Sequence, residues 1–159
     1  YFPFGAVMIA DAVAEVFEQD KTGRAAIGHG YTYSGHPVGA AAALACLQET
    51  LRLNVPENAA ARGQELHQGL LALQEKHPLI GDVRGGHGLM CAMELVADRA
   101  SKTPIDKQTT TTLQEVTYQN GAMVRISGPN IILSPPLVLT SQDVQGILTA
   151  LEAGFAAVR

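Results

Sequence analysis

The segment 28–37 (GHGYTYSGHP), followed directly by the alanine-rich run 38–45 (VGAAAALA), constrains the fold of this chain more than any other feature. Pro37 suits the first turn of a helix, where a backbone N–H has no helical partner and proline lacks one. Ahead of it, glycines let the backbone approach a ligand closely, and amide and hydroxyl donors collect at a helix N-terminus. The segment therefore predicts an anion-binding site, such as one for phosphate.

The composition excludes several classes of protein. The chain has 159 residues, 47% of them apolar, which is enough for one domain or for parts of two. Its net charge of −4 and its lack of tryptophan argue against nucleic acid as a partner. The apolar runs are too short to cross a membrane, and the first residues do not resemble a secretion signal. Cys46 and Cys91 are expected to be reduced core residues, which predicts a cytoplasmic protein.

The first 54 residues contain too little regular structure for an independent core. The apolar run 4–10 is typical of a strand buried on both faces, and Asp11 is expected to cap a short helix over 12–17. A polar loop over 19–30 and a helix over 38–53 follow. This region is therefore interpreted as the end of a larger α/β domain.

A boundary is predicted at 54–56 (NVP), and residues 55–159 are expected to form an α+β unit. The expected elements are helices over 57–76, 107–120 and 141–158, strands over 80–84 and 89–96, and a hairpin of 122–126 with 130–133. The apolar or small positions expected on the first of these helices are Ala59, Leu66, Leu70, Leu71 and Leu73.

Three blocks, in the right order and spacing, resemble the class III aminotransferases, the omega-aminotransferases that use pyridoxal phosphate (PLP). They are 28–43 (GHGYTYSGHPVGAAAA), 82–96 (DVRGGHGLMCAMELV) and 134–139 (SPPLVL), and 1–7 (YFPFGAV) is similar to the segment after the family's Schiff-base lysine. The resemblance implies PLP-dependent transferase fold type I, with α/β and α+β parts. Residues 1–54 would be the C-terminal remnant of the large PLP-binding domain, and 55–159 the small C-terminal domain.

The same resemblance implies a homodimer with shared active sites, or a tetramer built from it. The Schiff-base lysine would lie upstream of Tyr1, so no catalytic residue is expected within this chain, which alone is expected to be inactive. Its four lysines lie in polar loops or on solvated helix faces and do not replace that lysine: Lys21, Lys76, Lys102 and Lys107. The chain departs from the family's pattern near His87, where one extra residue precedes the Gly-Leu pair.

Three residues match family positions that contact the cofactor or substrate. Thr32 matches the threonine whose hydroxyl and amide hold the cofactor phosphate of the other subunit, and a short hydroxyl beside glycines suits that contact. Tyr31 is expected beside the same phosphate through its N–H. Arg125 matches the mobile arginine that binds the substrate's α-carboxylate. From the residues alone, Thr32 could instead cap a turn, Tyr31 could be a packing aromatic, and Arg125 could face solvent.

The resulting hypothesis is a PLP-dependent transfer of an amino group from an omega-amino acid or amine to pyruvate, a keto acid. Two alternatives stay open. One is a degenerate, non-catalytic paralogue or a dimerisation module of the same fold. The other is a decarboxylase or aminomutase within class III. The histidines have no metal-ligand spacing, and no metal is expected. His36 is expected to hydrogen-bond the backbone, and Arg84 to have a structural role.

Overall fold

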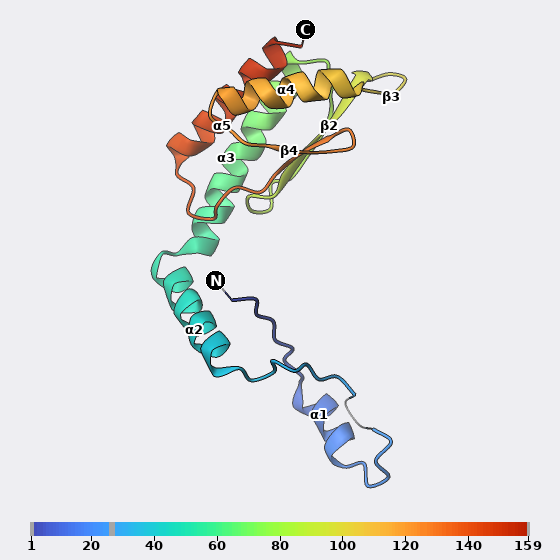
Figure 1. Ribbon diagram of the computed structural model, residues 1–159, viewed down its shortest axis with the longest axis vertical. Coiled ribbons are helices and arrows are strands. Elements are labelled where there is room, and N and C mark those ends of the chain that lie inside the picture. Colours follow the sequence, from blue (N-terminus) through green and yellow to red (C-terminus); the bar gives the residue numbers. More distant parts are fainter. Residues whose placement is uncertain (1, 26–27, 159) are drawn as a thin grey trace. The chain divides into compact units, whose positions relative to one another are not determined.

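The computed structural model describes residues 2–25 and 28–158 and divides into two compact units. Unit 1 comprises Tyr1–Arg52 and unit 2 comprises Leu53–Arg159 (Figure 1). No helix in the described ranges combines the length and the apolar character that a membrane crossing requires. The assignment of 1–54 to a large cofactor-binding domain and of 55–159 to a small one stays a prediction.

Unit 1 contains two helices, α1 (Asp11–Glu18) and α2 (Pro37–Arg52), and its described residues form no strand. The strand predicted over 4–10 is therefore wrong, and Phe4, Val7 and Met8 are exposed. A strand buried on both faces needs neighbouring strands to pair its backbone groups. The described part of this unit offers none.

Helix α1 begins one residue earlier than predicted. Ala10 occupies the N-cap position, and no side chain caps the helix, so the prediction that Asp11 caps it is wrong. Asp11 instead lies in the first turn, where a negative charge favours the N-terminus of a helix. The helix has no buried residue.

Helix α2 confirms the helix predicted over 38–53, with Pro37 at its first position. Gly39 is its buried residue, and a Cβ there would lie only 2.6 Å from the ring of Phe2. The absence of a side chain thus lets Phe2 pack on the first turn of the helix. Cys46 is exposed on α2, so the prediction that it is a core residue is wrong, whereas Cys91 is buried.

Unit 2 contains an antiparallel sheet in the order β1-β2-β5-β4. Its strands are β1 (Ile80–Arg84), β2 (Cys91–Asp98), β4 (Arg125–Ser127) and β5 (Asn130–Leu133). A short β3 (Thr103–Pro104) pairs with β2 and is not among the predicted strands. Strand β2 starts and ends two residues later than predicted. The predicted hairpin is confirmed, with Gly128 at φ +57° in its turn and a first strand shorter than predicted.

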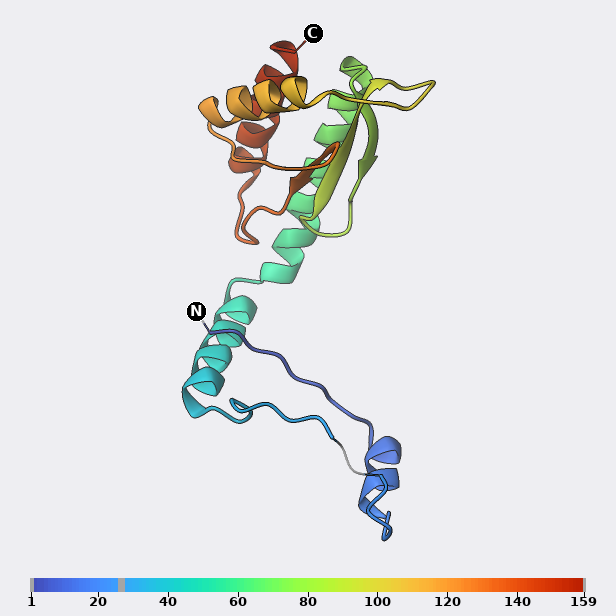
Figure 2. The same cartoon turned by 45° about the vertical axis from the view of Figure 1, so that its right-hand side comes forward.

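Three helices pack with this sheet: α3 (Val55–Lys76), α4 (Lys107–Gln119) and α5 (Ser141–Ala156). Helix α3 packs on β1 and β2, α4 packs on β4, and α5 packs on both helices, which gives a helical layer against the sheet (Figure 2). The largest fully buried side chains include Leu66, Leu70, Ile80, Met93, Leu95, Leu113, Ile131, Leu151 and Phe155. Of the positions predicted on α3, only Leu71 is partly exposed.

The start of α3 lies two residues before the predicted one, because Pro56 is accepted in its first turn. Asn54 precedes the helix with a left-handed backbone, φ 51°. Helix α5 starts at Ser141 as predicted, but its cap is Thr140. Gly121, which follows the C-cap residue of α4, has φ +99°.

Side chains of successive strand residues point to opposite faces of a sheet. The pairing register puts Arg84, Ala92, Ile132 and Arg125 in one row across the four strands. Buried Met93 and Ile131, which pair in the next position, belong to the core, so this row lies on the face away from the helices. The fold thus presents Arg125 on an edge strand, outside the core.

Candidate active-site residues

Thr32 lies in a pair of consecutive turns that lead into α2. The Ser34 N–H donates to the carbonyl of Tyr31 at 2.9 Å, and the His36 N–H donates to the carbonyl of Tyr33 at 3.2 Å. Gly35 has φ +68°, a conformation that glycine adopts without strain. The two turns bring residues 31–34 directly ahead of the helix N-terminus.

The donors of Thr32 face no acceptor in the part of the chain that the structure describes. Thr32 is exposed, and within residues 2–25 and 28–158 neither its amide nor its hydroxyl makes a hydrogen bond. Tyr31 is 71% exposed, and its N–H donates weakly to the Ser34 hydroxyl at 3.3 Å. A phosphate at Thr32 would meet two available donors, whereas one at the Tyr31 amide would compete with Ser34.

His36 is the N-cap residue of α2. Its carbonyl accepts the N–H of Ala40 at 2.9 Å, the first bond of the helix. Its ring Nδ1 accepts the N–H of Gly39 at 3.2 Å, which confirms the predicted backbone contact. The ring also stacks on Phe2, with centroids 5.3 Å apart, and lies 5.7 Å from the ring of Tyr33.

A cavity of about 790 Å³ lies beside these turns within unit 1. Small and aliphatic residues line part of it. Six aromatic side chains line the rest: Phe2, Phe4, His29, Tyr31, Tyr33 and His36. The sequence suggested neither the cavity nor the contact between Phe2 and His36, because 33 residues separate these two rings. The only local signal was a histidine directly before a helix-starting proline.

The Thr32 turn fits the phosphate of a cofactor. Phosphate binding needs donors that have no partner inside the protein, and preferably a helix N-terminus nearby. The amide and hydroxyl of Thr32 meet the first need, and α2 meets the second. In the described part of the chain, no three His, Cys, Asp or Glu side chains gather in a way that could hold a metal ion.

Arg125 and Arg84 share a row of the sheet but differ in their partners. Arg84 donates to Asp82 at 2.8 Å, to Glu94 at 3.2 Å and to Asn130 at 2.7 Å, which joins three strands and confirms its predicted structural role. Arg125 is exposed and has no hydrogen bond or ion pair to any described residue. Its guanidinium fork is available for a carboxylate.

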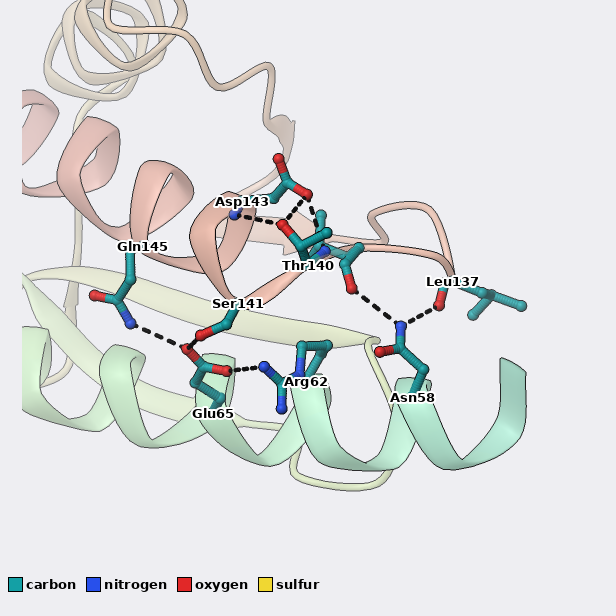
Figure 3. Close-up of polar contacts among 9 residues, drawn as sticks. Asn58, Arg62, Glu65, Leu137, Thr140, Ser141, Asp143 and Gln145 are labelled. Carbon is teal, nitrogen blue, oxygen red and sulfur yellow. Dashed lines mark hydrogen bonds and ion pairs between the residues drawn. The ribbon is translucent and has the colours of Figure 1, made fainter. Parts of the chain in front are cut away.

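The block 134–139 is attached to α3 in unit 2 (Figure 3). The side-chain amide of Asn58 donates to the carbonyls of Leu137, at 2.8 Å, and Leu139, at 3.0 Å. Nearby, Glu65 accepts the Ser141 hydroxyl at 2.6 Å. The hydrogen bonds from Ser141 and Gln145, with the charge of Arg62, hold the pKa of Glu65 below its ordinary value. These contacts connect α3 with α5 and give this block a structural role.

Comparisons with known proteins agree with this fold. A solved amine transaminase from an uncultivated Pseudomonas species, in its PLP-bound form, is 39% identical with a TM-score of 0.85, over 94% of this chain and 34% of that one. The putrescine–pyruvate aminotransferase of Pseudomonas aeruginosa is 33% identical, over 94% of this chain and 32% of that protein. The uncharacterised aminotransferase y4uB of Sinorhizobium fredii is 35% identical, over 99% of this chain and 34% of that protein.

The chain thus spans about a third of the length of these relatives. Its mixed helix-and-sheet fold is that of the PLP-dependent transaminases, which confirms the predicted fold class, α/β with α+β. The model of the family described as "Aminotransferase class-III" matches residues 2–155, in both units. The chain therefore belongs to the class III aminotransferases.

Proposed function

We propose that the complete protein is a PLP-dependent aminotransferase that moves an amino group from an omega-amino acid or amine to pyruvate. Membership of class III supports the reaction type, and a putrescine–pyruvate aminotransferase and an amine transaminase among its relatives support the substrates. The observation that carries the proposal is the Thr32 turn, whose amide and hydroxyl have no described internal partner beside the N-terminus of α2.

In this proposal the chain supplies binding and orientation. The Thr32 hydroxyl and amide donate to the cofactor phosphate, with the Tyr31 backbone beside it. Bound PLP supplies the electron sink that transamination requires. The Arg125 guanidinium binds the α-carboxylate of the keto acid through two parallel N–H donors, and its long stem can swing aside for an amine that has no carboxylate.

The active form is proposed to be a homodimer in which Thr32 serves the site of the second subunit, while Arg125 serves its own. The reacting lysine lies outside this chain. A cytoplasmic location is part of the proposal, because Cys46 and Cys91 are both free thiols.

The test measures amino transfer by the complete protein. It is incubated with PLP, an amine donor (putrescine or β-alanine) and either pyruvate or 2-oxoglutarate. We expect alanine from pyruvate at a rate well above that of glutamate from 2-oxoglutarate. In a parallel assay with an α-amino acid as donor, release of CO2 would favour a decarboxylase, and isomerisation of a donor without transfer would favour an aminomutase. No reaction with any donor would favour a non-catalytic paralogue.

The 159-residue chain alone, assayed in the same way, is expected to show no turnover. Its four lysines are exposed, and none lines the cavity beside Thr32. Alanine formation by the purified chain would contradict the assignment of the reacting lysine to another part of the protein.

A further inference from the structure

The ring of His36 makes three contacts in unit 1 that hold the end of the Thr32 turn. Nδ1 accepts the Gly39 N–H at 3.2 Å. One face stacks on Phe2, with an angle of 23° between the rings, and Tyr33 lies at 49° to it. Both ring separations fall in the range of attractive aromatic pairs. His36 thereby connects residue 2, the turn and the first turn of α2.

Thr32 depends on this anchor for its position. Its own amide and hydroxyl have no described partner in the chain, so only the two turns locate it. The second of these turns closes on the N–H of His36, and the first helical bond of α2 starts at its carbonyl. A movement of His36 would therefore move the turn that carries Thr32.

Histidine is not among the residues that usually cap helices, which are serine, threonine, aspartate and asparagine. Each of these could accept the Gly39 N–H, but none could also stack on two rings. Gly39 leaves room for Phe2, because any Cβ there would lie 2.6 Å from the Phe2 ring. The arrangement needs an acceptor and a flat ring in one side chain.

We propose that His36 is a positioning residue for cofactor binding: by capping α2 and stacking on Phe2 and Tyr33, it holds Thr32 where its donors meet the cofactor phosphate. This inference rests on the proposed function. In this inference His36 acts through the Thr32 turn, so it affects affinity for the phosphate group and not the chemical step.

The experiment separates the two properties of the ring in the complete protein. H36F keeps a flat ring and loses the acceptor, whereas H36N keeps an acceptor for the Gly39 N–H and loses the ring. H87F is the matched control, because His87 is an exposed loop histidine in unit 2. Dissociation constants are measured for PLP and for pyridoxal, which lacks the phosphate, and kcat is measured at saturating PLP.

We expect H36F to bind PLP about tenfold more weakly, the size of effect that a lost helix cap gives, with its affinity for pyridoxal unchanged. H36N, which keeps an acceptor but loses both ring contacts, is expected to bind PLP more tightly than H36F and more weakly than the wild type, and H87F to match the wild type. The kcat at saturating PLP should stay within about twofold in all variants. If H36F does not fold, H36M removes the acceptor with a more adaptable side chain.

Equal loss of PLP and pyridoxal affinity in H36F would assign His36 a general structural role and overturn the inference. Unchanged PLP affinity in H36F would overturn it as well. Both results leave the proposed function standing. If instead the wild-type protein binds PLP no better than pyridoxal, the phosphate site at Thr32 is wrong, and the proposed function fails with the inference.

Discussion

The partners of a side chain decide whether it is available for a ligand, and two arginines of unit 2 demonstrate this at the scale of single residues. Arg84 makes three hydrogen bonds to side chains of β1, β2 and β5, which use its donors. Arg125 stands in the same row with no described partner. The residue type is the same, and only the surroundings distinguish a structural arginine from a candidate for binding substrate.

Replacing Arg125 by alanine should impair the keto-acid half of the reaction. A charge-assisted pair is worth about 1.5–3 kcal/mol, so KM for pyruvate is expected to rise about 10- to 100-fold. Donation from a diamine without a carboxylate should change less than about twofold. Half-reactions are followed separately by stopped-flow absorbance, with K107A as control for the loss of an exposed positive charge. Equal losses in both halves would contradict the proposed role.

Replacing Thr32 by valine should weaken retention of the cofactor. Valine keeps the branched shape but has no hydroxyl, and one lost bond to a charged phosphate costs about 1.5–3 kcal/mol. The dissociation constant for PLP is expected to rise about 10- to 100-fold in equilibrium dialysis. T32S retains the hydroxyl and should stay near the wild type. A T32V protein with unchanged affinity would remove Thr32 from the site.

At the scale of elements, helix ends are where local sequence acts most directly. Thr140 and Asp143 form a capping box at the start of α5, and Asp106 caps α4 by accepting the N–H of Thr109 at 2.9 Å. The N-cap of α2 is different, because its histidine needs tertiary partners for its ring. Caps of the first kind depend on residues three positions apart in the sequence, whereas the second kind depends on tertiary contacts.

The α5 cap gives a prediction for stability. T140A removes the acceptor for the Asp143 N–H and should lower the free energy of unfolding by about 1 kcal/mol at pH 7, measured by urea denaturation. T140S keeps the oxygen and should lose much less. A T140A chain as stable as the wild type would show that α5 does not depend on this cap.

The same cap should respond to pH. Hydrogen bonds from the Thr140 hydroxyl and amide lower the pKa of Asp143 below its ordinary value of 3.8. A lowered folded-state pKa adds stability that is present above the unfolded value and is lost as the pH falls through the folded value. Below about pH 4, the difference in stability between wild type and D143N should therefore shrink. A constant difference across that range would contradict this account.

At the scale of the whole molecule, the core of unit 2 depends on a close approach between α3 and the loop after β1. A Cβ at Gly63 would lie 2.0 Å from the carbonyl oxygen of Gly88, a backbone atom that cannot move aside alone. G63A is expected to destabilise the protein by about 1–3 kcal/mol, the usual cost of overpacking.

Gly146 in α5 is the matched control, because nothing lies within 4 Å of a Cβ there. G146A should stabilise the protein by about 0.5–1 kcal/mol through helix propensity. Thermal denaturation of both variants tests the pair. A G63A protein at least as stable as the wild type would mean that the loop at Gly88 can move aside without a loss of stability.

The sequence alone determined the elements whose signals are local. Pro37 specified the start of α2, and the spacing of Leu66, Leu70 and Leu73 specified the inner face of α3. The strands β1 and β2 were predicted to within two residues of their observed ends. The family also followed from motifs in the chain. These predictions are correct because helix starts and apolar periodicity depend on neighbours a few residues away.

Tertiary structure decided whatever depends on distant partners. The apolar run 4–10 has the composition of a buried strand, but a strand forms only where other strands pair with its backbone, and the described part of unit 1 has none. Likewise, the sheet register places Arg84 and Arg125 in one row across the strands. Within the described residues, Arg84 has hydrogen-bond partners there and Arg125 has none. The contact of Phe2 with His36 follows from chain packing across 33 intervening residues. A short segment of sequence does not predict a long-range contact, because neither partner has a local feature that identifies the other.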